Sequence, residues 1–447
     1  MRHSRAVSAR RPPLPIPEDP PPDTPFEREF WSSPLRGPWL TTILGSSLLP
    51  LIIVAGITGF LSHAAYDPNP SGEGQFNLYL FSWPAGPTYL YVVTQGLHVI
   101  AGLAAIPILF AKLWSVIPKL FEWPPVRSLA HGVERLALAL LVGGALFVLF
   151  TGVLNIQSTF LWSFSFLDAH YYASFVFLAG LGLHLVVKAP IIFRAYRENG
   201  VLRPLKDDVA HTVPEPLLSR DAMAAAPTSE EHTTVSPAPG PATVSRRGLL
   251  GLVGAGSLGL AIMAAGPVIG GPLRSLGLLS PRGRGVGTGP NDFQVNKTLA
   301  AAGLTEKDLG PDWRLTLIAG DREVELSRDQ LLALPQRTET LPIACVEGWS
   351  TTEEWTGVSI RDLARMALGN EAPAEVFVES FQKAGGFTST TLSDNKVMNP
   401  RALLALKVNG ADLSPDHGFP ARIIVPALPG VRNIKWVDRM TVMPAAA

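Results

Sequence analysis

Five stretches of the sequence contain no Asp, Glu, Lys or Arg, and they limit the possible folds more than any other feature. They cover residues 37–66, 74–111, 136–167, 169–187 and 248–273. An α-helix rises 1.5 Å per residue, so about 20 apolar residues cross a ~30 Å hydrocarbon core. We therefore predict membrane helices near residues 40–62, 88–111, 129–153, 168–192 and 248–271. The alternative, buried helices in a large soluble protein, fits poorly with such long uncharged runs.

The basic residues between these stretches predict how the helices are oriented, because Lys and Arg near helix ends stay on the cytoplasmic side. Six precede the first helix, none separates the first from the second, three follow the second, none separates the third from the fourth, and eight precede the fifth. This alternation predicts a multi-pass protein of the cytoplasmic membrane. Its N-terminus is expected to be cytoplasmic, and the segment after the fifth helix extracytoplasmic.

Composition agrees with a chain that lies partly in lipid. Only 17% of the residues are charged and 47% are hydrophobic, whereas about a quarter are charged in a typical soluble domain. Lys plus Arg number 37 and Asp plus Glu number 37. There is no basic excess of the kind that nucleic-acid binding requires, so we expect no nucleic-acid partner.

Changes in composition along the sequence divide the chain into six segments. Residues 1–36 hold eight prolines between Pro12 and Pro25, which predicts a disordered cytoplasmic tail. A four-helix membrane domain is expected over 37–195. A cytoplasmic linker rich in Pro, Ala, Ser and Thr follows over 196–245. The fifth helix is expected within 246–272, a second linker over 273–290, and a soluble domain over 291–447.

Arg246 and Arg247 precede a Gly-rich apolar run. This arrangement resembles a twin-arginine signal placed inside the chain. The alternative is an ordinary basic flank on the cytoplasmic side of a helix. A twin-arginine signal would export the following domain already folded around a cofactor. We see no convincing cleavage site, so the fifth helix is expected to remain as an anchor.

Several histidines fall inside the predicted membrane helices, where polar groups are costly and mark functional sites. His170 and His184 are fourteen residues apart on the fourth helix, which places them about 21 Å apart on nearly the same face. They could each ligate one of two stacked haems, with His98 facing His170 in the outer half and His131 facing His184 in the inner half. His63 is a rival ligand, in a scheme that pairs His63 with His170 and His98 with His184. The alternative for any single histidine is a hydrogen bond to a neighbouring helix.

The layout of residues 40–195 resembles the four-helix di-haem cytochromes b that serve membrane-bound hydrogenases and formate dehydrogenases. The resemblance implies two haems b and exchange of electrons with membrane quinone. Arg135 and Lys188, one turn beyond the inner histidines, could neutralise haem propionates. One departure is that the first helix lacks a histidine at its cytoplasmic start, which is why His131 is considered for the inner haem.

The last part of the chain alternates short apolar runs with turn residues, which predicts a soluble α+β domain. Strands are expected over 314–319, 340–346, 376–380, 401–408 and 421–426, a helix over 358–368, and turns at Asn409-Gly410 and Pro429-Gly430. Cys345 is the single cysteine, which excludes an internal disulfide and a zinc site with several thiolates. It is predicted to lie at the end of a strand. Taken alone, such a cysteine is usually a small buried hydrophobe.

Two sequence motifs indicate a different role for Cys345. Residues 416–422 read Asp-His-Gly-Phe-Pro-Ala-Arg and residues 430–436 read Gly-Val-Arg-Asn-Ile-Lys-Trp. Together with residues 403–410, they resemble the pterin-phosphate signature of the sulfite-oxidase family of molybdenum enzymes. His417, Arg422 and Lys435 are three donors suited to a dianionic phosphate. The resemblance implies that Cys345 is the protein thiolate on a molybdenum held by molybdopterin, whose chemistry is oxygen-atom transfer.

The chain departs from sulfite oxidases near residue 296. In place of their Phe-x-x-Arg-Asn-His pattern it reads Phe-Gln-Val-Asn-Lys over residues 293–297. The absent arginine weakens the case for sulfite as substrate, and Asn296 is closer to the methionine-sulfoxide-reductase branch of the family. Only eleven residues follow Trp436, too few for the immunoglobulin-like dimerisation domain of sulfite oxidases. The resemblance therefore gives no argument for a dimer, and the oligomeric state stays open.

These observations predict a transmembrane helical bundle, with four haem-binding helices and one anchor helix, followed by an α+β molybdopterin domain. The expected function is exchange of electrons between an extracytoplasmic small molecule and the quinone pool through b-type haems. The substrate is expected to be an S- or N-oxide or a sulfite-like molecule, with Asn296 favouring reduction. The alternative is a non-catalytic transport or binding protein whose histidines relay protons.

Overall fold

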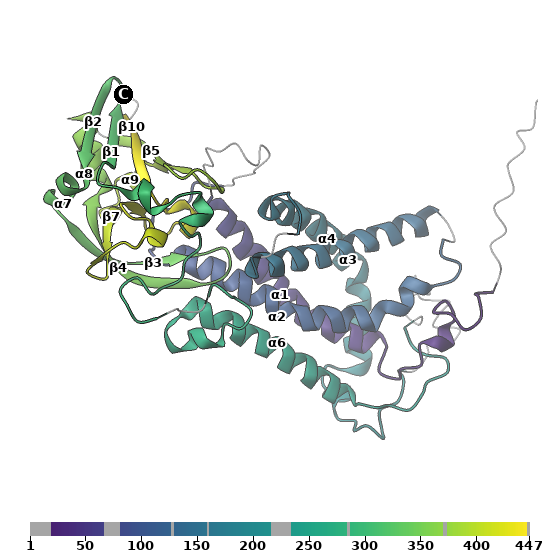
Figure 1. The fold of residues 1–447 in the computed structure, drawn as a ribbon. Helices are drawn as coiled ribbons and strands as arrows, with labels where there is room; N and C mark the ends of the chain where they lie inside the picture. Colours follow the sequence, from purple (N-terminus) through teal and green to yellow (C-terminus); the bar gives the residue numbers. More distant parts are fainter. Residues whose placement is uncertain are drawn as a thin grey trace, which may run out of the picture. The chain divides into compact units, whose positions relative to one another are not determined.

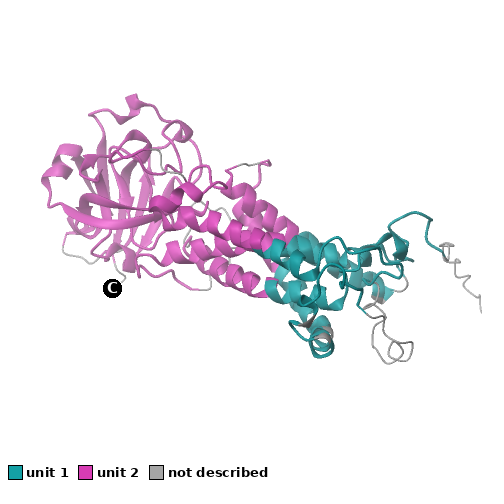
Figure 2. Cartoon of the chain, turned by 90° about the horizontal axis from the view of Figure 1, so that it is seen from below, with its two compact units in different colours: residues 1–47, 108–143, 176–254 teal, residues 48–107, 144–175, 255–447 magenta. Residues whose placement is uncertain are grey.

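The computed structural model describes residues 19–66, 81–126, 129–158, 161–215, 234–283, 287–369 and 373–444. The chain divides into two compact units (Figure 2). The first comprises residues 1–47, 108–143 and 176–254, and the second comprises 48–107, 144–175 and 255–447. The boundaries fall inside the long helices, so each of these helices contributes residues to both units.

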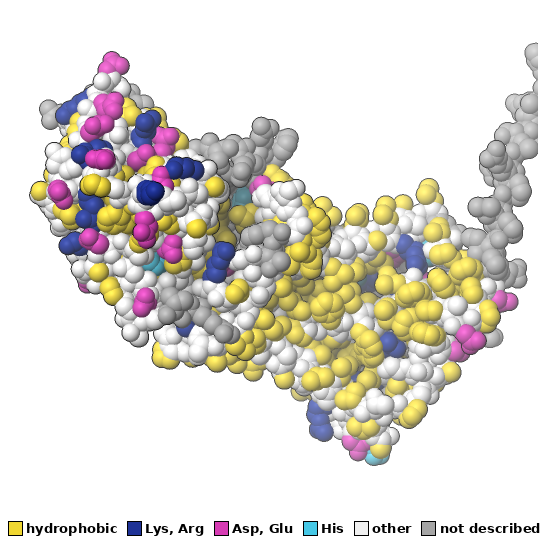
Figure 3. All heavy atoms as spheres, in the orientation of Figure 1, with side chains coloured by type: hydrophobic (Ala, Val, Ile, Leu, Met, Phe, Trp, Pro, Cys, Tyr) yellow, Lys and Arg dark blue, Asp and Glu magenta, His cyan; other side chains and the backbone are white. Residues whose placement is uncertain are grey.

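The predicted long helices are present in the structure (Figure 1). They are α1 (Pro38–Ala64), α2 (Leu90–Val116), α3 (Leu129–Ile156), α4 (Phe166–Asn199) and α6 (Arg246–Ile269). Within the described residues, these five helices are long and apolar enough to cross a membrane. Their large apolar side chains remain exposed, as at Val133, Val186 and Phe193. Hydrophobic side chains dominate the helical surface in Figure 3, as expected where lipid is the solvent.

The described end of the predicted N-terminal tail, residues 19–36, contains local structure. A short 3-10 helix covers Arg28–Phe30. The Arg36 guanidinium lies 4.3 Å from the centroid of the Trp114 ring, and its Nε donates to the Trp114 carbonyl over 3.2 Å. This cation–π contact ties the chain just before α1 to α2, and the prediction of a disordered tail over 1–36 stays a prediction. Residues 1–18 of the predicted tail and 216–233 of the predicted linker lie outside the described residues.

The C-terminal domain contains two β-sheets, as an α+β domain predicts. The first has the strand order β2 (Arg322–Ser327), β1 (Arg314–Ala319), β10 (Val437–Pro444), β5 (Pro373–Ser380) and β6 (Ser389–Ser393). The second has the order β3 (Arg337–Ala344), β4 (Ser350–Ser359), β7 (Leu403–Val408) and β8 (Ala411–Asp412), and β9 (Arg422–Ile424) also pairs with β7. Only the β1–β10 pair is parallel among these named strand pairs.

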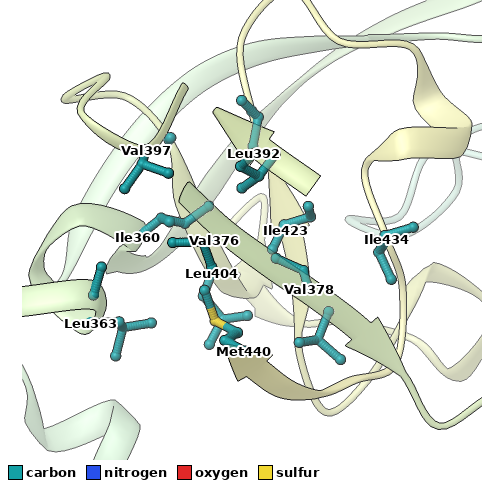
Figure 4. Packing of buried hydrophobic residues seen from close by; sticks show 14 of the residues in the cluster. Ile360, Leu363, Val376, Val378, Leu392, Val397, Leu404, Ile423, Ile434 and Met440 are labelled. Carbon is teal, nitrogen blue, oxygen red and sulfur yellow. The ribbon is translucent and has the colours of Figure 1, made fainter. Parts of the chain in front are cut away.

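Helix α8 (Ile360–Leu368) covers the core of this domain. Its buried residues recur at helical spacing, at Ile360, Leu363, Ala364 and Ala367. They join side chains of β5, β7 and β10 in one apolar cluster (Figure 4), which contains Val376, Val378, Leu404 and Met440. Burying each large side chain contributes roughly 1.5–3 kcal/mol. Two short helices, α7 (Arg328–Ala333) and α9 (Asp394–Val397), complete the domain.

The predicted turn at Asn409-Gly410 connects β7 to β8. Asn409 has φ of 49° and Gly410 has φ of 80°, the left-handed values that a tight two-residue hairpin turn requires. This turn brings the chain back toward Pro415–His417, a 3-10 helix that begins the predicted phosphate-binding stretch.

Candidate functional site

Cys345 follows directly on strand β3 and begins a tight turn. The Cys345 amide donates to the Trp349 carbonyl over 2.9 Å, and the Gly348 amide donates to the Cys345 carbonyl over 3.1 Å. Gly348 has φ of +79°, which a residue without a side chain adopts at little cost. The Cys345 side chain is buried, and burial raises the pKa of its thiol. A thiolate here needs a bound cation to stabilise it.

Glu347 ties this turn to the predicted site residue Asn296. Its Oε1 lies 2.9 Å from Nη1 of Arg282, and its Oε2 accepts a hydrogen bond of 2.9 Å from Nε1 of Trp349. The same Arg282 nitrogen donates to the Asn296 carbonyl over 3.1 Å. Sequence reasoning missed this Glu347–Arg282 pair. The nearness of Glu347 to Cys345 along the chain was visible, but the position of Arg282 needed the fold.

The predicted phosphate donors come together behind the turn. Arg422, the first residue of β9, donates to the carbonyls of His417 and Asn433, each over 3.1 Å. Lys435 Nζ donates to the carbonyls of Lys297 and Asp416, each over 2.7 Å. Nε2 of His417 is 3.0 Å from the Asn291 carbonyl. Main-chain contacts thus hold all three side chains in place.

This cluster has the properties of an anion site. Among the residues that the structure describes, no carboxylate forms an ion pair with Arg422 or Lys435. Nε of Arg422 is buried and makes no hydrogen bond. Because buried charges are costly unless they are paired, these groups fit a negatively charged ligand such as the phosphate of a pterin cofactor.

Burial shifts the protonation of the same three groups. It lowers the pKa of Arg422 to about 9 and lowers the pKa of Lys435 well below its ordinary value, with the charge of Arg422 adding to the effect at Lys435. Burial also lowers the pKa of His417 from 6.5 to about 3, helped by the charges of Lys435 and Arg422. A dianion bound among them would reverse these shifts, since opposite charge favours the protonated forms.

A small pocket of about 30 Å³ lies beside this cluster. Polar side chains from separate segments line it, among them Asn296, Lys297, Gln382, Asn433 and Lys435. Gly430 also lines it, and the preceding Pro429 forms a β-bridge with Ala344, the residue before Cys345. The fold therefore brings the predicted Asn296, Lys435 and Cys345 into one region.

His98 and His170 form a facing pair, as the outer-haem prediction requires. Their ring centroids are 5.9 Å apart and their planes meet at 81°. Nδ1 of His98 is 2.8 Å from the Ala55 carbonyl, and Nδ1 of His170 is 3.0 Å from the Thr151 hydroxyl. Each ring thus has its Nδ1 engaged, which leaves Nε2 as the nitrogen for a metal.

Glycines lie against both of these rings. A Cβ added at Gly59 would come within 2.8 Å of Cε1 and Nδ1 of His98, and one added at Gly152 would come within 3.5 Å of Cε1 of His170. His63 is placed differently, because its ring stacks on Tyr171 with centroids 3.7 Å apart. The His98 ring thus faces that of His170, whereas the His63 ring faces that of Tyr171, and the haem pairing stays a prediction.

The inner histidines belong to the other unit and stay a prediction. Nε2 of His131 is 3.9 Å from a carboxylate oxygen of Glu122. His184 lies within electrostatic range of Lys112, Lys119 and Lys188. Such basic groups would suit the propionates of a haem, in agreement with the role expected of Lys188. Arg135 instead donates to the carbonyls of Lys119 and Leu120.

The C-terminal domain is similar in sequence to known proteins. A family model described as the oxidoreductase molybdopterin binding domain matches residues 302–447. A nitrate reductase (NADPH) of Beauveria bassiana is 33% identical over 162 residues, which cover 34% of this chain and 18% of that protein. The mitochondrial sulfite oxidase of Homo sapiens is 31% identical over 169 residues, which cover 32% of this chain and 31% of that protein.

The chain thus spans less than a third of the length of these relatives. Among solved structures, the sulfane dehydrogenase SoxCD from Paracoccus pantotrophus matches 31% of this chain and 40% of that chain, with 23% identity and a TM-score of 0.26. The chain therefore carries an oxidoreductase molybdopterin-binding domain, similar to those of sulfite oxidases and nitrate reductases, and the predicted class of enzyme is confirmed at this level.

Proposed function

We propose that this chain is a membrane-bound molybdenum oxidoreductase that exchanges electrons between a small extracytoplasmic substrate and membrane quinone through b-type haems. One observation carries the proposal. The second compact unit contains both the buried Cys345 beside an unpaired cation cluster and the facing imidazoles of His98 and His170. A binding module or a proton relay would need no such combination.

The residues of the soluble domain fit the pterin group in a specific way. Arg422, Lys435 and His417 would hold its phosphate, and Cys345 would supply a thiolate to the metal. When bound, the molybdenum group supplies two-electron oxygen-atom transfer. The Cys345–Trp349 turn fixes the backbone that carries the sulfur, and the side chains of the cluster are themselves buried. Low local polarity strengthens each of these electrostatic contacts.

The membrane part would accept the electrons singly. His98 and His170 would hold one haem, which would supply one-electron transfer, and the Nδ1 contacts of both rings fix the orientation of the two imidazoles. Two transfers therefore match one substrate turnover. His131 and His184 would hold a second haem, and a quinone would complete the proposed route.

We favour reduction of an S- or N-oxide over oxidation of sulfite, because Asn296 stands where sulfite oxidases have an arginine. In that direction quinol loses two electrons and two protons, and the oxide takes up two electrons and two protons to give the reduced product and water. The names of the matched relatives also make sulfite and nitrate substrates to test.

The test is a redox assay of membranes that contain the full chain. Reduced membranes should show b-type haem bands, and one compound from a panel of sulfoxides, N-oxides, sulfite and nitrate should change the haem oxidation state. The Cys345→Ser variant should lose this response and its molybdenum. Membranes with neither haem nor molybdenum would favour a non-catalytic protein instead.

The haem part has its own test. His98→Ala and His170→Ala should each remove the same haem, because the two rings face each other. His63→Ala should retain that haem, because the His63 ring stacks on Tyr171. Difference spectra of the three variants decide between the pairings, and loss of a haem in His63→Ala alone would favour the rival scheme.

A further inference from the structure

The turn that begins at Cys345 is held by polar side chains of the apolar helices. Nε2 of Gln95 on α2 donates to the Val346 carbonyl over 2.9 Å. Nδ2 of Asn155 on α3 donates to the same oxygen over 3.4 Å. Val346 is the next residue after Cys345. One carbonyl, with two lone pairs, thus receives a donor from each of two helices.

The backbone of the turn also packs closely on α2. A Cβ added at Gly348 would come within 2.8 Å of Cγ1 of Val99, so only glycine lets the turn approach this far. Gln95 and Val99 are four residues apart and therefore lie on one face of α2. His98 lies between them along the helix. The turn thus packs on the segment of α2 that carries His98.

The second donor has a similar relation to the other imidazole. Asn155 lies one turn beyond Thr151 on α3, and the Thr151 hydroxyl is 3.0 Å from Nδ1 of His170. Gln95 is therefore within one helical turn of His98. Asn155 is one turn from Thr151, which contacts His170. Polar side chains in such apolar helices are costly, and contact with the turn explains why they are there.

We infer that Gln95 and Asn155 are positioning residues that dock the Cys345 turn on α2 and α3 and form the bonded route for electrons between Cys345 and the His98–His170 pair. The inference rests on the proposed function. Each transfer moves one electron, so the site that gives the electron is oxidised and the site that receives it is reduced. Two such transfers match one oxide reduced and one quinol oxidised, and no proton crosses this route.

The experiment compares Gln95→Leu, Asn155→Leu and the double variant with the wild-type chain, all full-length and purified in detergent. Flash photoreduction with deazaflavin reduces the haem, and the haem band then reports electron transfer onward to the molybdenum site without any substrate. We expect this relaxation to slow several-fold in each single variant and further in the double variant. Molybdenum and haem contents should stay at wild-type levels.

Hydrogen exchange gives a readout that does not depend on electron transfer. Loss of one hydrogen bond should lower the protection of the backbone amides in the Cys345–Trp349 turn by a factor of about 5–30. Gln336→Leu is the matched control, because Nε2 of Gln336 also donates to a backbone carbonyl, that of Leu331, at the opposite end of β3 from this turn. It should change neither the relaxation nor the exchange of residues 345–349.

Three results would overturn the inference. The first is a wild-type relaxation rate in a double variant that retains both cofactors, and the second is equal slowing in Gln336→Leu. The third is unchanged exchange in the turn. If Gln95→Leu does not fold, Gln95→Asn removes the same contact by shortening the side chain and gives the same test. A wild-type chain without haem or molybdenum would instead overturn the proposed function, so the two failures are distinguishable.

Discussion

At the scale of single residues, the proposed anion site depends on side chains that have no negatively charged partner among the described residues. Within that part of the chain, Arg422 makes hydrogen bonds only to backbone carbonyls, and its Nε makes none. We expect Arg422→Met to retain much less molybdopterin after purification, because a charge-assisted contact to the phosphate is lost. Arg314→Met, which removes an exposed arginine from the same domain, should keep the cofactor. Metal analysis and pterin fluorescence of the two variants measure the difference.

The pKa of His417 makes the cofactor-free protein sensitive to acid. Its pKa is about 3 in the fold, against an ordinary value of 6.5. Between these pH values the unfolded chain binds a proton that the folded chain does not, so the stabilisation is complete above pH 6.5 and is lost as pH falls. We therefore expect the free energy of unfolding to decrease from about pH 7 to about pH 5, and less so in His417→Gln.

Chemical denaturation of cofactor-free protein at the two pH values measures this effect. His211→Gln serves as the control, because the His211 side chain is exposed and bound only to nearby Asp208. An equal pH dependence in His417→Gln and wild type would show that other groups control acid sensitivity. A smaller dependence when the cofactor is bound would agree with a phosphate that raises the pKa of His417.

At the scale of helices and strands, glycine positions control how closely α1 approaches the outer imidazole. A Cβ at Gly59 would lie 2.8 Å from the His98 ring, whereas a Cβ at Gly56 would meet nothing within 4 Å. We expect Gly59→Ala to displace His98 and to shift or remove the outer haem band. Gly56→Ala, one turn earlier on the same helix, should keep it, and alanine should favour the helix slightly at both positions.

Difference spectra of the two glycine variants provide the measurement. Alanine favours a helix more than glycine does, so a loss of haem in Gly59→Ala cannot come from a weaker helix. A wild-type spectrum in Gly59→Ala would mean that His98 moves aside without cost. Loss of haem in both variants would point to the packing of α1 as a whole rather than to the His98 contact.

Some of the helices and strands could be predicted from the sequence, and others could not. The long helices were predictable because long uncharged apolar runs are typical of helices that can cross a membrane, and β1 was predicted at 314–319, where the structure has Arg314–Ala319. Strands β2 and β4 were missed because their residues are largely polar or exposed and form no apolar run. Their place in the sheets comes from pairing with β1, β3 and β7.

The site divides in a similar way. His417, Arg422 and Lys435 were proposed because they stand in motifs that resemble the family signature, and Cys345 because that resemblance implies it; their roles stay predictions. Gln95 had a weaker signal, as a polar residue three positions before His98 in an apolar helix. Its partner, the Val346 carbonyl, is 251 residues away in sequence, and no local pattern encodes such a contact.

At the scale of the whole molecule, the connection between α1 and α2 completes the core of the C-terminal domain. Trp83 is buried in the same cluster as Leu404 and Met440. Its Nε1 donates to the Ala427 carbonyl over 2.7 Å, and its own carbonyl accepts from Lys396 Nζ over 3.2 Å. Sequence reasoning treated this stretch only as the flank of a membrane helix. The domain therefore has part of its core outside 291–447.

This arrangement predicts that the C-terminal domain depends on the chain before residue 291 for its stability. Trp83→Ala in the full chain should destabilise the domain by roughly 3–5 kcal/mol, because a large buried side chain leaves a cavity. Limited proteolysis should then cut within 291–447 more readily, and residues 291–447 expressed alone should be cut at least as fast. Trp162→Ala, at an aromatic side chain that is 48% exposed, should leave the cutting rate unchanged. A fragment as resistant as the full chain would show that the domain core closes without Trp83.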